Sequence, residues 1–157
     1  MKTFRQFLES EQVQYDNWVR YTGSSVKSDF VEYKKKEESK WQDRAERIGM
    51  RFPIFDSEEQ FRTDLDNAKI VSVSELDNVR NMSFNSSIED IESMVGTYHQ
   101  PRDVKRIVQG LKNNAQIPMP IILKGSKGMW IMAGNTRQST ARVLGIDADV
   151  LLVDVSK

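Results

Sequence analysis

Apolar residues recur in two different rhythms along the chain, one helical and one strand-like. In the first half, spacings of three and four residues predict helices. The first expected helix begins at Thr3, and Trp18 and Val19 continue the helical spacing after it. A break is expected at 22–25, followed by a long polar helix over 28–48. The first half therefore reads as a set of amphipathic and polar helices.

Local signals mark where two of these helices end and begin. Gly49 follows the last apolar position of the long helix and is the residue type that favours a helix stop. The stretch from Asp56 to Glu59, with Ser57 at its second position, is typical of a capping box. The helix that it opens is expected to bury Phe61 and Leu65.

The second half alternates short apolar runs with helical segments. Ile121 to Leu123 and Met129 to Met132 flank a glycine-containing loop, which predicts a β-hairpin. The sequence predicts strands over 69–73 and 150–155, an amphipathic helix over 102–112 and a helix from the hairpin to about residue 144. We therefore expect an α+β (α/β) fold, with a helical N-terminal extension over 1–67 and a small mixed-sheet domain over 68–157.

Composition removes several classes of function. The chain has no cysteine, which excludes disulfides and thiolate chemistry, and one histidine, which cannot form a two-histidine metal site. No stretch approaches the roughly 18 apolar residues of a membrane span, and the N-terminus lacks the apolar core of a signal peptide. A cytoplasmic protein that does not enter a membrane is expected.

The formal net charge of zero hides a strongly basic segment. Residues 101–142 contain eight basic residues and one acidic residue, Asp103. A segment of one sign predicts an anionic partner, although the acidic first half of the chain is an alternative partner for it. On the first interpretation the helix face with Lys105, Arg106 and Lys112 contacts nucleic acid.

The strongest candidate for chemistry is the turn Gly134-Asn135-Thr136-Arg137, between an expected strand and an expected helix. A glycine there lets the chain turn sharply, and the free N–H groups of the following helix attract an anion. Arg137 adds a planar guanidinium that can bind phosphate, and Asn135 or Thr136 can cap the helix or touch the ligand. The same sequence is also how an ordinary strand-to-helix loop is made.

The order of these elements resembles the ParB/sulfiredoxin superfamily. The resemblance covers roughly 68–155 and is most specific over 118–155, from the apolar hairpin through Gly134 and Arg137 to the closing strand. The start of the chain and the overall layout also resemble ParB-like "nuclease" domain proteins of large tailed bacteriophages. The resemblance implies a ParB/sulfiredoxin-like mixed sheet with flanking helices, and a turn that holds the phosphates of ATP or CTP with Mg²⁺.

Three departures limit what the resemblance implies. Asn135 stands where sulfiredoxins have a catalytic cysteine, so reduction of sulfinic acids is not expected. ParB proteins have a glutamate there and an arginine at the position of Thr136, which puts their CTP chemistry in doubt. The printed sequence also ends directly after the last expected strand, so it offers no counterpart of the ParB helix-turn-helix.

Three hypotheses remain. The first is a nucleotide-dependent phosphotransferase or hydrolase linked to DNA, in which Asp103 is the base and Arg102 or Lys105 neutralises developing charge. The second is a non-catalytic DNA-binding or regulatory module of phage–host interaction, whose N-terminal helices recruit a partner protein or a second copy. The third is a metal-dependent ParB-like nuclease, although its basic segment holds a single carboxylate.

Overall fold

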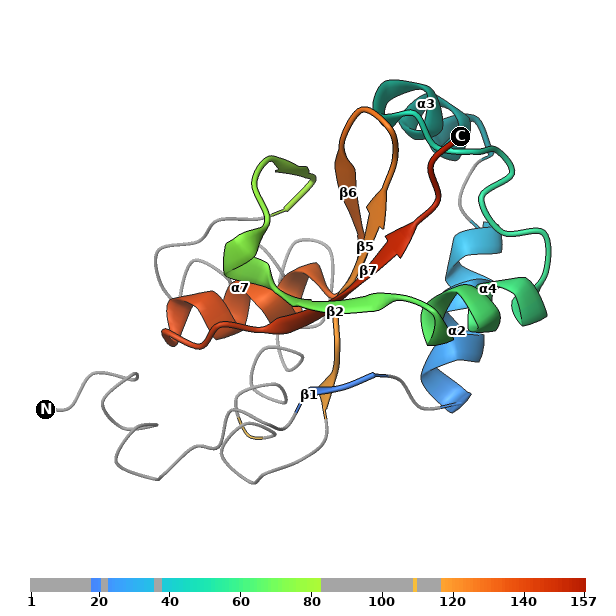
Figure 1. Cartoon of the computed structure of the whole chain (residues 1–157). Coiled ribbons are helices and arrows are strands. Elements are labelled where there is room, and N and C mark those ends of the chain that lie inside the picture. The colour runs from blue at the N-terminus through green and yellow to red at the C-terminus, as the bar shows by residue number, and fades with distance from the viewer. Residues whose placement is uncertain (1–17, 21–22, 36–37, 83–108, 110–116) are drawn as a thin grey trace, which may run out of the picture.

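The computed structural model describes residues 18–20, 23–35, 38–82, 109 and 117–157, and it confirms the α+β class (Figure 1). Within these residues no helix is long and apolar enough to cross a membrane. The helices are α2 (Gly23–Lys35), α3 (Glu38–Ile48), α4 (Glu58–Asp66), the 3₁₀ helix η1 (Val73–Glu75) and α7 (Asn135–Val143). The strands are β1 (Trp18–Val19), β2 (Lys69–Ser72), β3 (Val79–Arg80), β4 (Ile117–Pro118), β5 (Ile121–Lys124), β6 (Met129–Ala133) and β7 (Asp149–Asp154).

Five of the strands form one mixed sheet in the order β2-β7-β5-β6-β3. Antiparallel pairs join β2 to β7 and β5 to β6, while β7 pairs with β5 and β6 pairs with β3 in parallel. The predicted hairpin is confirmed as β5 and β6, and the predicted first and last strands are confirmed as β2 and β7. Strands β1 and β4 form a separate parallel pair.

The central strand β5 is buried on both faces. Ile121 and Leu123 belong to the larger hydrophobic cluster, and Ile122 between them belongs to a smaller cluster on the other face. All three residues are fully buried. A continuous apolar run without alternation is the pattern of a strand covered on both sides, so the sequence of β5 fits the central position that it occupies.

Two predictions in the first half are wrong. Trp18 and Val19, which we expected in a helix, form β1 and pair with Ile117 and Pro118 of β4. The expected helix over 28–48 is two helices, and the first begins at Gly23 inside the expected break. Trp18 is buried in the larger cluster, so tertiary packing and pairing with a distant strand outweigh the local helical spacing. The predicted stop at Gly49 is confirmed, with a φ of 70°.

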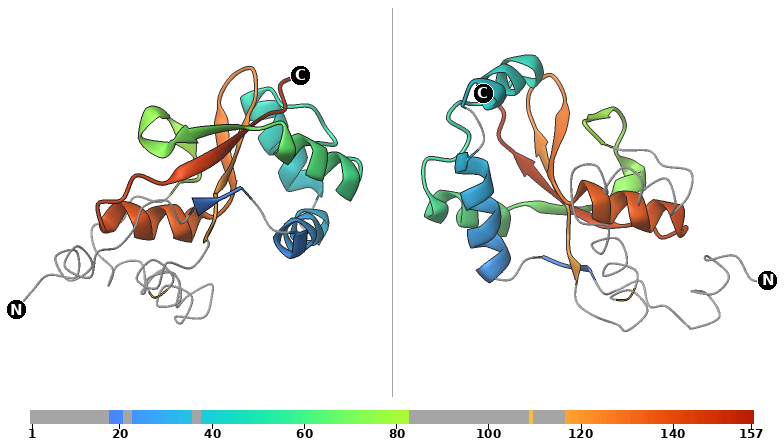
Figure 2. Two further views of the ribbon diagram at one scale, coloured as in Figure 1. Left: turned by 60° about the horizontal axis from the view of Figure 1, so that its bottom comes forward. Right: turned by 180° about the vertical axis from the view of Figure 1, so that it is seen from behind.

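The larger hydrophobic cluster spans both sides of the predicted boundary near residue 68. It contains Trp41, Phe61 and Leu65 from the helices and Leu151 and Val153 from the sheet. Figures 1 and 2 show that α2, α3 and α4 gather at one end of the sheet, while α7 lies toward the other. The helices before the sheet therefore share one core with it, and the division into an extension and a domain stays a prediction.

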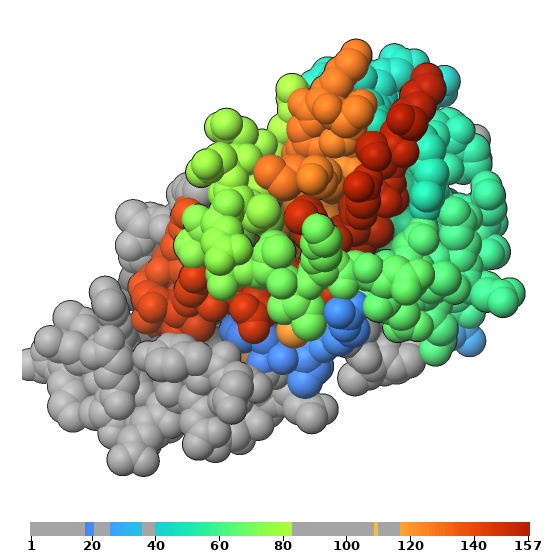
Figure 3. All heavy atoms as spheres, in the orientation of Figure 1, coloured from blue at the N-terminus to red at the C-terminus, as the bar shows by residue number. Residues whose placement is uncertain are grey.

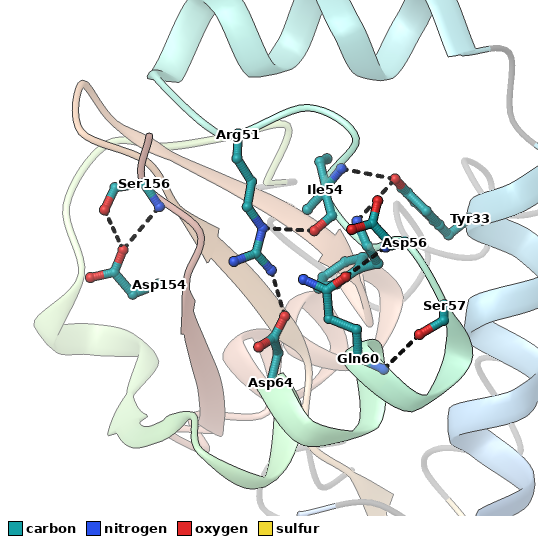
Figure 4. A network of polar contacts seen from close by, with 10 residues as sticks. Tyr33, Arg51, Ile54, Asp56, Ser57, Gln60, Asp64, Asp154 and Ser156 are labelled. Carbon is teal, nitrogen blue, oxygen red and sulfur yellow. Dashed lines mark hydrogen bonds and ion pairs between the residues drawn. The ribbon is translucent and has the colours of Figure 1, made fainter.

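Buried backbone groups between α3 and α4 are satisfied by side chains from elsewhere (Figure 4). The Tyr33 hydroxyl accepts hydrogen bonds from the backbone N–H groups of Ile54 and Phe55, at 3.1 and 3.3 Å. The predicted N-cap at Ser57 is confirmed, because its Oγ accepts from the N–H of Gln60. The tyrosine hydroxyl therefore fixes the chain where it enters the core ahead of α4.

Tyr33→Phe should destabilise the protein by about 1–3 kcal/mol, because two buried N–H donors lose their acceptor. Urea unfolding followed by circular dichroism measures this loss. An unchanged unfolding midpoint for Tyr33→Phe would show that these N–H groups do not need the Tyr33 hydroxyl as their acceptor.

Candidate phosphate-binding site

The β5–β6 hairpin connects the end of α3 to the candidate site. At its tip, the N–H of Lys127 donates to the carbonyl of Ile48 at 2.8 Å, and the N–H of Ser126 donates to that of Gly49 at 3.1 Å. These bonds attach the hairpin to the end of α3. From there β6 runs to Gly134, which is the N-cap of α7. The predicted order of strand, turn and helix is therefore confirmed.

Gly134 has two structural reasons to be glycine. Its φ of 85° is in the left-handed region, which costs an L-amino acid with a side chain roughly 1–2 kcal/mol. A Cβ at this position would also lie 2.7 Å from Pro120 Cα and 2.8 Å from Arg137 Nη2, closer than real Cβ contacts. The turn therefore lies directly against the residue that precedes β5.

The guanidinium of Arg137 folds back over this glycine. Its Nη2 atom is the one that approaches the position of a Gly134 Cβ, and both Nε and Nη2 are buried. Neither atom has a hydrogen-bond partner within the described part of the chain. Burial lowers the pKa of Arg137, and the carboxylate of Asp29 on α2 partly opposes this effect. Arg137 is therefore a half-buried cation that has two buried, unused donor atoms.

The backbone around Gly134 has the geometry of an anion-binding nest. A left-handed residue followed directly by right-handed helical residues turns successive N–H groups toward one point. The first turn of α7 contains no acidic residue, so nothing in it opposes an anion. The Oδ1 atom of Asn135 accepts a hydrogen bond from Gln138 Nε2 at 3.0 Å. Asn135 thus orders the first turn, in place of the helix-capping role that we expected for it or Thr136.

Sequence reasoning missed polar residues that follow the turn along α7. Gln138, Ser139 and Thr140 are all buried, and the Thr140 hydroxyl has no hydrogen-bond partner among the described residues. It also missed Asp29, the acidic residue that opposes the pKa shift of Arg137. No local pattern could have linked Asp29 to Arg137, because α2 and α7 are distant in the sequence. The available signal for the buried residues was that α7 has only two apolar residues, Ala141 and Val143, so any face that it buries must include polar ones.

The remaining predicted site residues are not brought to this turn by the described structure. Arg102, Asp103, Lys105, Arg106 and Lys112 all lie outside the described residues. The other basic residues of the segment are exposed, with Lys124 and Lys127 in and beside the hairpin loop and Arg142 in the last turn of α7. Within the described ranges no group of His, Cys, Asp and Glu is arranged to hold a metal ion.

Gly134→Ala should lower stability by about 2–4 kcal/mol, because it combines a left-handed backbone with a steric overlap against Pro120. Thermal unfolding of the purified variant measures this. Gly145→Ala is the matched control, since Gly145 also has a positive φ of 77° but is exposed. Equal losses for the two variants would mean that the contact with Pro120 adds nothing to the backbone cost.

Comparison of the chain with protein-family models, with curated proteins and with solved structures found no match. The resemblance to the ParB/sulfiredoxin superfamily therefore stays a prediction from the order of elements and the Gly134–Arg137 turn. Any functional proposal must be supported by the geometry of that turn.

Proposed function

We propose that the turn at Gly134–Arg137 binds the phosphate groups of a nucleotide, ATP or CTP. The observation that supports this most directly is that the Nε and Nη2 donors of the half-buried Arg137 are themselves buried and have no partner among the described residues. Leaving a buried charged donor without an acceptor costs more than leaving a neutral one. A phosphate oxygen supplies charge and acceptor together and offers the planar fork of arginine a bidentate contact.

The backbone supports the same assignment independently of the side chain. Gly134 is in the left-handed region and the helix that follows begins at Asn135. The N–H groups of a first helical turn attract anions through their partial positive charge and their unused hydrogen-bonding capacity. Arginine and nest together provide several donors at one turn, which suits the several oxygens of a phosphate.

The proposal extends to phosphoryl transfer or nucleotide hydrolysis linked to DNA, with Asp103 as base and Arg102 as a neutralising cation. This step rests on the sequence alone, since both residues lie outside the described ranges. The described residues offer no carboxylate cluster for a metal. We therefore expect Mg²⁺ to enter with the nucleotide, bound to its phosphates. Phosphate binding is the part of the proposal that Arg137 supports and is tested first.

A purely structural role for Arg137 is the competing explanation, with Asp29 as its counter-charge. The two explanations predict opposite effects of removing the charge. Arg137→Met keeps most of the volume of the side chain and removes the guanidinium. If the guanidinium serves a ligand, the variant should be as stable as the wild type or more stable by about 1–2 kcal/mol in phosphate-free buffer.

If Arg137 instead serves as a structural counter-charge to Asp29, the same variant should lose about 1 kcal/mol, because the half-buried carboxylate of Asp29 would lose a favourable charge. Chemical unfolding of both proteins in phosphate-free buffer measures the difference. A loss of that size would count against a ligand-binding role. The double variant Arg137→Met, Asp29→Asn then shows whether the loss arises from this pair, since it should recover most of the stability.

Binding itself is tested by the effect of anions on thermal unfolding. Tripolyphosphate, ATP and CTP should raise the unfolding temperature of the wild type by several degrees at concentrations about 100 times the dissociation constant. Arg137→Gln should abolish the shift, while Arg142→Gln, on the exposed last turn of the same helix, should keep it. No shift with any anion, or a shift that survives Arg137→Gln, would refute the proposal. GTP and UTP show whether the base is recognised.

A further inference from the structure

Arg44 of α3 is held against two tryptophans where this helix meets the β5–β6 hairpin. Its guanidinium lies over both indole rings, with the central carbon 4.8 Å from the ring centre of Trp41 and 5.0 Å from that of Trp130. A cation is attracted to the face of an aromatic ring, and the N–H groups of a guanidinium point outward in its own plane. Trp41 is buried in the core and Trp130 packs against it, so the core fixes the position of Arg44.

The N–H groups of this guanidinium have no acceptor within the described part of the chain. Arg44 forms no hydrogen bond or ion pair there, although its side chain is half-buried. Burial lowers the pKa of Arg44, and the charge of the neighbouring Asp43 opposes this only in part. The carboxylate of Asp43 instead forms an ion pair with Arg47, at 3.0 Å. The donors of Arg44 are therefore available to an anion.

Three more cations lie around Arg44, and all three are exposed. Lys40 precedes it by four residues on α3 and Arg47 follows it by three, so these side chains lie along one stripe of the helix. The third cation is Arg80 of β3, whose partner in the strand register is Trp130. Paired residues of neighbouring strands lie on the same face of a sheet. Arg80 is therefore beside Trp130 on the face that α3 contacts.

The hairpin lies between the two elements that carry these cations. Strand β6 pairs with β3, and α3 contacts β6. In Figure 3 the teal surface that includes α3 reaches the tip of the hairpin (orange), and the green surface that includes β3 lies along the hairpin's other side. No grey atoms lie over the hairpin on this face. We call the four residues Lys40, Arg44, Arg47 and Arg80 the Arg44 surface.

We propose that the Arg44 surface binds the phosphate backbone of a nucleic acid. Asp43, which flanks the stripe, is already paired with Arg47, and Glu46 lies on the opposite side of the helix. The surface therefore carries an excess of positive charge. The stripe from Lys40 to Arg47 is about 10 Å long, and one strand of DNA carries about three phosphates over that length.

The chemistry of the surface favours a nucleic acid over an acidic protein. A guanidinium can bind two oxygens of one phosphate, and a row of phosphates meets several cations at once. Trp130, beside Arg44 and Arg80, is partly exposed. An aromatic ring among cations is typical of surfaces that bind single-stranded nucleic acids, because bases stack on such rings. The surface therefore offers contacts to the backbone and to the bases.

Fluorescence anisotropy of labelled single-stranded and duplex oligonucleotides, at low salt and over a salt series, tests this proposal. The wild type should bind at least one of them, more weakly as salt rises. Arg44→Gln and Arg80→Gln should each weaken binding about fivefold and reduce the slope of log affinity against log salt by about 1. Arg62→Gln removes the same charge from an exposed position on α4 and should leave the affinity within about twofold of the wild type.

Thermal unfolding shows whether each variant keeps its fold, and the exposed Arg80 keeps the test valid if Arg44→Gln loosens α3. A wild type that binds neither oligonucleotide would overturn the proposal. So would an equal loss for Arg62→Gln, or binding that neither Arg44→Gln nor Arg80→Gln weakens, since the contact would then lie elsewhere in the chain. Displacement of the oligonucleotide by poly-L-glutamate at equal charge concentration would assign the surface to an acidic protein instead.

These results are independent of the phosphate-binding proposal. The Arg44 surface shares no residue with the turn at Gly134, and the anion-dependent stabilisation expected there is measured without nucleic acid. Either proposal can therefore fail while the other holds.

Discussion

Burial of β5 on both faces is the constraint on which the rest of the structure depends. Ile121, Ile122 and Leu123 are fully buried, and burying each such side chain contributes about 1.5–3 kcal/mol. The strand pairs with β7 on one side and β6 on the other. Pro120, which precedes it, is the residue against which Gly134 lies. The position of the candidate site is therefore set by the central strand of the core.

Placing Arg137 at this site lowers the stability of the folded protein. Burial disfavours the charged guanidinium, which lowers its pKa, and the carboxylate of Asp29 offsets only part of this. A methionine of similar volume would fit the site without these penalties. An arginine is explained if an anion supplies the missing acceptors, since a ligand that binds only the folded state returns the lost stability.

Sequence reasoning succeeded where local patterns decide the structure. The apolar runs on either side of a glycine loop predicted the β5–β6 hairpin, and Ser57 with the apolar residues Phe61 and Leu65 predicted α4. The Gly134 turn was found because a strand, a glycine and a helix occur in immediate succession. Each of these features is determined by residues a few positions apart.

Sequence reasoning failed where contacts between distant parts of the chain determine the structure. Trp18 has helical spacing, yet it forms β1 because Ile117 offers it a parallel partner and the core buries its indole. The boundary between α2 and α3 lies inside a run of lysines and glutamates that favours a helix throughout. Local helix propensity therefore does not predict this boundary. The effect of Asp29 on the pKa of Arg137 depends on the relative positions of α2 and α7, which no local window contains.

Several polar groups at the ends of elements are satisfied by side chains from far along the sequence. Tyr33 serves the N–H groups ahead of α4, Arg20 serves the carbonyls that follow it, and Asp147 serves the N–H of Ser74. Arg137 is the one charged side chain with buried, unpartnered atoms among the described residues. Leaving these atoms without an acceptor lowers the stability of the folded protein unless an anion supplies one.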